Sequence, residues 1–143
     1  MSRIDFYSLE PGSRGDRFLL ACKLVERIRA KGLRALIFCP DLEQARHLDR
    51  LLWTYRDDSF LPHGLVGKVD TDLTPILIST DGRPETEHQV LINLALQPPD
   101  FLNRFERVCD LVDQNPEILA AGRVRYRGYR GAGLEPNHHK LKL

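Results

Sequence analysis

The first half of the chain alternates short β-prone runs with segments of helical periodicity, and no other feature constrains the fold as much. Residues 4–9 form the first apolar run. Between Asp16, a candidate N-cap, and Gly32, a candidate helix stop, apolar residues recur at helical spacing. A second β-prone run at 33–39 and a second helical segment at 41–55 repeat this order. Such an order with short connections predicts parallel strands joined by right-handed crossovers in an α/β layer structure.

The second half predicts further strands and one closing helix. We expect strands at 75–80, 89–95 and 107–112. Asn115 suits an N-cap and Pro116 the first helical position, so the last helix should begin there, and the chain should loosen after Gly131. The predicted fold class is a Rossmann-like α/β domain with a mostly parallel sheet flanked by helices and without a functional nucleotide site.

Length and composition favour one domain. With 143 residues, 42% of them hydrophobic, the chain can bury a core without disulfides or metal ions. We assign residues 1–133 to a single α/β domain and residues 134–143 to a basic C-terminal tail. Cys22, Cys39 and Cys109 are widely spaced in apolar stretches, which favours buried thiols in a reducing cytoplasm. The sequence has no long hydrophobic segment, so we expect a cytoplasmic protein without membrane association.

The chain lacks the motifs of a nucleotide site or a catalytic centre. The loop 11–16 has neither the glycine spacing of a dinucleotide-binding turn nor the Gly-Lys-Ser/Thr ending of a phosphate loop. Cys39 can be paired with His47 or His63 as nucleophile and base, but nothing local activates a thiol at the end of a buried strand. We therefore expect no cofactor, no metal ion and no catalytic residue. A small enzyme with a degenerate nucleotide fold is the third of three hypotheses.

Positive charge is concentrated near the C-terminal end. Residues 123–143 hold six Lys and Arg against one Asp or Glu, whereas the rest of the chain is net acidic. One face of the predicted last helix carries Arg123, Tyr126, Arg127 and Arg130. At about 100° per residue these four fall within about a 100° arc, so three guanidinium groups surround one phenol ring. This face predicts docking of an acidic, partly apolar ligand, such as a free C-terminus with a hydrophobic last residue; a solvated basic helix face is the alternative.

Aromatic residues cluster at the end of the second predicted helix and in the loop beyond it. The cluster includes Trp53, Tyr55, Phe60, Pro62 and His63. These rings can close the edge of the core. They can equally form an apolar docking patch, because aromatic residues supply many interface hot spots. The sequence leaves both interpretations open.

Two motifs, weak separately and specific together, indicate a family. They are Leu52-Trp53 followed by Ser59-Phe60-Leu61-Pro62-His63, and the run Arg123-Val-Arg-Tyr-Arg-Gly-Tyr-Arg130. With them, nearly the whole chain resembles the chi subunit of the bacterial DNA polymerase III holoenzyme. The resemblance implies a non-catalytic accessory subunit of the clamp loader. Such a subunit binds the acidic, phenylalanine-terminated tail of single-stranded-DNA-binding protein and links it to the holoenzyme in DNA replication.

The resemblance also implies roles for individual residues in tail binding. Arg123 and Arg127 would pair with the acidic groups and terminal carboxylate of the tail. Tyr126 and Val112 would form the apolar pocket for its last ring, and Arg130 would add charge. The chain departs from better-known members at Leu119, where they carry a lysine.

A second docking surface is implied at the aromatic cluster. There Trp53, Phe60, Pro62 and His63 would contact the psi subunit of the clamp loader or an accessory helicase. Contact with DNA would then be indirect. The competing hypothesis is a direct single-stranded nucleic-acid-binding protein that uses the C-terminal arginine helix on phosphates.

Overall fold

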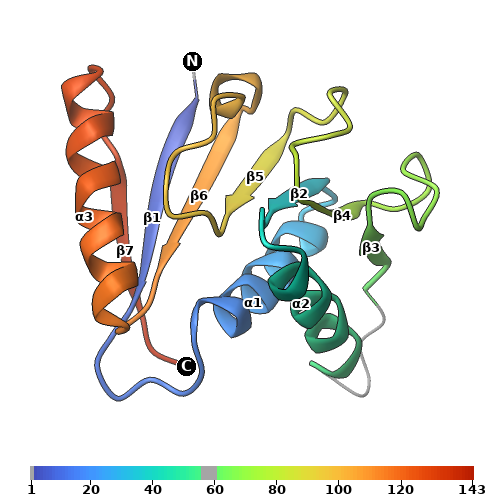
Figure 1. The fold of residues 1–143 in the computed structure, drawn as a ribbon, viewed down its shortest axis with the longest axis horizontal. Coiled ribbons are helices and arrows are strands. Elements are labelled where there is room, and N and C mark those ends of the chain that lie inside the picture. The colour runs from blue at the N-terminus through green and yellow to red at the C-terminus, as the bar shows by residue number, and fades with distance from the viewer. Residues whose placement is uncertain (1, 56–60) are drawn as a thin grey trace.

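A seven-stranded parallel sheet forms the centre of the computed structural model, which describes residues 2–55 and 61–143 (Figure 1). Its strands are β1 (Arg3–Leu9), β2 (Ala35–Phe38), β3 (His63–Leu65), β4 (Ile76–Ser79), β5 (Val90–Asn93), β6 (Arg107–Val112) and β7 (Asn137–Leu141). They lie in the order β3-β4-β2-β5-β6-β1-β7, and every neighbouring pair is parallel. The α/β class with a parallel sheet is confirmed.

Within the described residues, three α-helices and one short 3-10 helix flank the sheet. They are α1 (Arg17–Ala30), α2 (Leu42–Thr54), η1 (Leu102–Arg104) and α3 (Pro116–Gly131). Each α-helix begins after a polar cap: the side chains of Asp16, Asp41 and Asn115 accept hydrogen bonds from backbone N–H groups of the first turn. The helix starts predicted from these caps are confirmed.

Strand alternation divides the core into two clusters, one on each face of the sheet. Along β1, Tyr7 and Leu9 belong to the cluster packed by α1 and α2, whereas Ile4 and Phe6 belong to the cluster packed by α3 and the segment around η1. The central strands are buried on both faces, so they appear in the sequence as continuous apolar runs. Their parallel arrangement follows from the crossover helices and loops that cover both faces.

The structure contains two edge strands that the sequence did not predict, β3 and β7. The short strand β3 pairs with β4, and β7 pairs with β1 in the segment that we expected to loosen after Gly131. That expectation is wrong for Asn137–Leu141. The β7 sequence is polar, and side-chain contacts of His138 with Ser8 and of His139 with Asp5 add to its backbone pairing with β1. Such pairing depends on a distant strand, so local periodicity does not reveal it.

The described residues hold neither a candidate membrane span nor a candidate metal cluster. No helix within them is long and apolar enough to cross a bilayer. No group of three or more His, Cys, Asp or Glu side chains in the same residues is arranged to hold a metal ion. Cys22, Cys39 and Cys109 are buried free thiols, as the sequence predicted.

Candidate functional site

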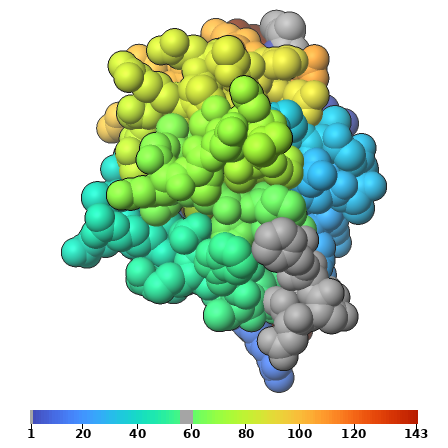
Figure 2. All heavy atoms as spheres, turned by 90° about the vertical axis from the view of Figure 1, so that its right-hand side faces the viewer, coloured from blue at the N-terminus to red at the C-terminus, as the bar shows by residue number. Residues whose placement is uncertain are grey.

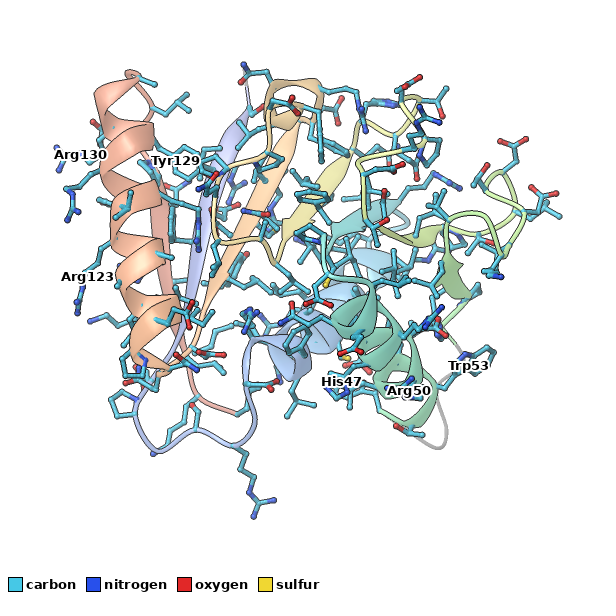
Figure 3. The ribbon with its side chains drawn as sticks, viewed as in Figure 1. His47, Arg50, Trp53, Arg123, Tyr129 and Arg130 are labelled. Atoms are coloured by element: carbon cyan, nitrogen blue, oxygen red, sulfur yellow. The ribbon has the colours of Figure 1, made fainter. Side chains whose placement is uncertain are left out.

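A buried ion pair sets the rotation of α3 about its own axis. The Nε of Arg125 lies 2.9 and 3.0 Å from the two carboxylate oxygens of Asp110 in β6. Its Nη1 donates to the carbonyl of Leu96 at 2.7 Å, and the Tyr129 hydroxyl donates to Asp110 at 2.8 Å. Because Arg125 and Tyr129 point inward, residues on the other side of the helix point to solvent, and Figure 3 shows Arg123 and Arg130 there.

A glycine lets α3 approach the sheet closely. A Cβ atom added to Gly122 would lie 2.5 Å from Cγ1 of Val112, a separation that real Cβ atoms essentially never show. One turn further along, Tyr126 is half-buried and meets Phe6 edge-on, with ring centroids 5.4 Å apart. The close approach at Gly122 fixes the distance of the helix from β6, and the ring contact at Tyr126 fixes its distance from β1.

Between α3 and the sheet lies a hollow of about 500 Å³. It is lined by Phe6, Ser8, Val112, Leu119, Gly122, Arg123, Tyr126, Arg127 and His138. The helix supplies one wall, and β1, β6 and β7 supply the rest. We call this hollow the α3 groove.

The α3 groove brings together four of the five residues that the sequence analysis singled out for tail binding. Arg123, Tyr126, Arg127 and Val112 all line it. Arg130 lies on the same helix, exposed to solvent, but is not among the lining residues. Leu119 also lines the groove and contributes apolar surface to the wall.

Five lining residues were not predicted as site residues: Phe6, Ser8, Leu119, Gly122 and His138. Phe6 and Ser8 project from β1 toward the side of α3, and strand alternation could have suggested this placement. His138 comes from β7, and no local signal predicted that strand. Its ring Nε2 lies 2.9 Å from the hydroxyl oxygen of Ser8.

The electrostatics of the α3 groove favour an anion. No carboxylate is among its lining residues, and within the described residues neither Arg123 nor Arg127 has a salt-bridge partner. Phe6, Val112 and Tyr126 add apolar surface beside these cations. The groove can therefore accept a ligand that combines negative charge with an apolar group.

The residues of the second predicted surface differ in exposure: Trp53 is exposed, whereas His63 is buried beneath it. Trp53 on α2 is 57% exposed, and its ring centroid lies 4.8 Å from that of His63. His63 is buried, with Nδ1 2.6 Å from the Leu61 carbonyl and Nε2 3.4 Å from a carboxylate oxygen of Asp49. Pro62 is half-buried, and Phe60 lies outside the described residues.

Helix α2 presents this surface on the side of the molecule opposite α3 (Figures 1 and 2). In Figure 3, His47, Arg50 and Trp53 project from one side of α2, as their spacing along a helix requires. The structure therefore separates the two predicted docking surfaces, with the sheet between them.

Solved structures that share this fold include helicase domains. Mss116p DEAD-box helicase domain 2, bound to an RNA duplex, has a TM-score of 0.61 at 14% identity, covering 98% of this chain and 65% of that chain. T4 UvsW has a TM-score of 0.65 at 12% identity, covering 96% of this chain and 41% of that chain. At such low identity the likeness shows the fold alone.

Sequence comparisons identify the family. The family model described as DNA polymerase III chi subunit, HolC, matches residues 1–137. DNA polymerase III subunit chi of Pseudomonas aeruginosa is 34% identical over 141 residues, covering 99% of this chain and 98% of the relative. That of Escherichia coli is 33% identical over 142 residues, covering 96% and 97%. The chain therefore belongs to the family of the DNA polymerase III chi subunit, a DNA replication accessory protein.

Proposed function

We propose that this protein is a non-catalytic, cytoplasmic adaptor that binds the acidic C-terminal tail of single-stranded-DNA-binding protein and links it to the clamp loader of the polymerase. The observation that carries the proposal is the α3 groove, where Arg123 and Arg127 stand beside the rings of Phe6 and Tyr126 without a carboxylate partner among the described residues. A peptide with acidic residues and a terminal aromatic residue matches both halves of this surface.

In this proposal, different residues of the α3 groove bind different parts of the tail. Arg123 and Arg127 bind the acidic side chains and the terminal carboxylate, because planar guanidinium forks pair with carboxylates in two-point contacts. Val112 and Tyr126 contact the last ring of the tail. Arg130 lies beyond the groove and contributes long-range attraction, which depends on salt.

Calorimetry with a peptide ending in Asp-Asp-x-Pro-Phe tests this function. We expect micromolar affinity that weakens as salt rises, because partly exposed ion pairs are screened. Arg127→Ala or Tyr126→Ala should weaken binding by about 1–2 kcal/mol, whereas Arg50→Ala on the far helix should leave it unchanged. Unaltered affinity in both groove variants, or equal binding of a peptide with an amidated C-terminus, would contradict the assigned site.

We propose that a second partner, the psi subunit or an accessory helicase, docks at Trp53 and Pro62. Phe60, which the sequence also assigns to this surface, lies outside the described residues. The large exposed ring of Trp53 supports this proposal. Trp53→Ala should abolish binding of the purified partner while the variant still melts cooperatively at the parent temperature. His63→Ala should lower the melting temperature because that ring is buried and hydrogen-bonded to the backbone. Full partner binding by a folded Trp53→Ala variant would place the surface elsewhere.

The competing function is direct binding of single-stranded nucleic acid. The exposed arginines of α3 favour it, since Arg123, Arg127 and Arg130 present three cations on one helix face. A gel shift with bare single-stranded DNA decides between the two functions. The adaptor hypothesis predicts that the protein alone does not shift bare DNA but further retards the complex of the DNA with single-stranded-DNA-binding protein. The competing hypothesis predicts that the protein alone shifts bare DNA and that this shift disappears steeply with salt.

A further inference from the structure

Strand β7 directs two consecutive histidines to opposite faces of the sheet. His139 lies on the face of α1, where its Nε2 is 3.0 Å from a carboxylate oxygen of the buried Asp5 and its ring stacks on Tyr7 at 4.6 Å. His138 lies on the face of α3 and lines the α3 groove. The first histidine anchors the strand, and the second is left with an exposed ring beside the proposed binding surface.

The surroundings of His138 are positively charged or neutral. From β7 itself, Lys140 and His139 act on it electrostatically; from β1, the Ser8 hydroxyl oxygen lies 2.9 Å from its Nε2. From α3, Arg123 and Arg127 line the same groove, and no carboxylate is among the lining residues. Among the residues that the structure describes, this imidazole therefore has no anionic partner in the groove, and a bound acidic peptide would supply one.

We propose that His138 is a further recognition residue of the α3 groove: when protonated it pairs with an acidic side chain of the bound tail, so that tail capture strengthens as the pH falls below neutrality. The inference rests on the proposed function. It adds a residue of β7, which lines the groove together with the arginines of α3, to the proposed binding site.

The direction of the effect follows from the charges involved. Burial, and then the charges of Lys140 and His139, lower the pKa of His138 below its ordinary value, so the free protein carries a neutral ring at neutral pH. The aspartates of the tail titrate near pH 4 and stay ionised over the range of about 5.5–7.5. Binding them favours the protonated ring, and linkage requires that protonation in turn favours binding. The Ser8 hydroxyl can accept from or donate to the ring, so their contact suits both charge states.

Affinity measured against pH at constant ionic strength provides the first test. For the parent protein we expect the acidic peptide to bind about two- to fivefold more tightly at pH 5.5 than at pH 7.5, the size of one partly exposed ion pair. His138→Gln should show a flat profile of affinity against pH, whereas His139→Gln, on the other face, should retain the slope. An equal slope in the parent and in His138→Gln would overturn the proposal.

Proton NMR of the His138 ring measures its pKa, which peptide binding would not change if the residue had only a structural role. The pKa of His138 should rise when the peptide binds, and Lys140→Gln should raise it in the free protein. A pKa that the peptide leaves unchanged would refute the pairing.

The two tests separate this inference from the proposed function. If the peptide binds at pH 7.5 and Arg127→Ala weakens it while His138→Gln keeps the parent slope, only the role of His138 fails. If the parent does not bind the peptide at either pH, the proposed function fails and the role of His138 with it.

Discussion

Arg125 and Asp110 form an ion pair that is closed to solvent on both sides, with side-chain exposures of 2% and 0%. The pair connects the middle of α3 to the middle of β6 and decides which face of the helix meets the sheet. Arg123 and Arg127 lie two residues on either side of Arg125, so both are exposed to solvent, where they border the α3 groove. The orientation of the proposed binding residues therefore depends on a residue that does not line the groove.

Breaking this pair should be costly and pH-dependent. Arg125→Ala leaves an uncompensated buried carboxylate, and we expect a loss of about 3–5 kcal/mol in the free energy of unfolding at pH 7. Burial raises the pKa of Asp110 above its ordinary value even with its partners present. Without Arg125 the carboxyl should be protonated more readily, so stability present at low pH is lost as pH rises through the folded-state pKa.

Urea denaturation at pH 5 and pH 7 measures this effect. The loss should be smaller at pH 5, and the double variant Arg125→Met with Asp110→Leu should recover much of it because it removes both charges. Arg123→Ala, an exposed control, should change stability by less than about 0.5 kcal/mol. A loss in Arg125→Ala as small as that of the control would show that the pair does not hold the helix.

Two of the glycines in α3, Gly122 and Gly128, should respond oppositely to alanine. At Gly122 the added methyl would collide with Val112, and we expect destabilisation by about 1–3 kcal/mol together with weaker peptide binding as the helix is displaced. At Gly128 nothing lies within 4 Å of the added atom, so Gly128→Ala should stabilise the helix by about 0.5–1 kcal/mol.

Thermal melts and peptide titrations of both glycine variants check this prediction. Gly122→Ala combined with Val112→Ala should regain part of the lost stability, because the truncated side chain makes room for the new methyl. Equal effects of the two single substitutions would mean that helix propensity, not close packing, governs α3.

Leu119→Lys should strengthen binding of the acidic peptide. Leu119 lines the α3 groove, and an added ammonium group there would meet the same anionic ligand as Arg123 one turn later. We expect a gain of about 0.5–1 kcal/mol at low salt that shrinks as salt is raised. Fluorescence anisotropy with a labelled peptide measures it, and Ala120→Lys, outside the lining residues, is the matched control. A similar gain from both lysines would indicate general charge attraction rather than a contact in the groove.

The three thiols should react only when the protein opens. Burial raises the pKa of Cys22 and Cys109 to about 12 and that of Cys39 to about 11, so little thiolate exists at pH 8. We expect no reaction with a disulfide reagent over minutes in the native protein and three equivalents in denaturant. Fast labelling of one thiol without denaturant would reveal local opening of the core around it.

The strands and helices that sequence analysis predicted are those with strong local signals. The apolar runs that became β2, β4 and β5 lie in the buried centre of the sheet, so their hydrophobicity is nearly continuous. The caps Asp16, Asp41 and Asn115 mark the helix starts through hydrogen bonds within one turn. The polar edge strand β7 escaped prediction because its stability comes from β1, more than a hundred residues away.

What the sequence by itself determined is the stripe of Arg123, Tyr126, Arg127 and Arg130, since helical spacing alone puts these residues on one face. What only the tertiary structure decided is which of them border a hollow. The buried contact of Arg125 with Asp110 rotates the helix, the lack of a side chain at Gly122 sets its distance from β6, and β7 brings His138 to the opposite wall. The physical reason is range: spacing along a helix is a local property, whereas a groove exists only where separate elements meet.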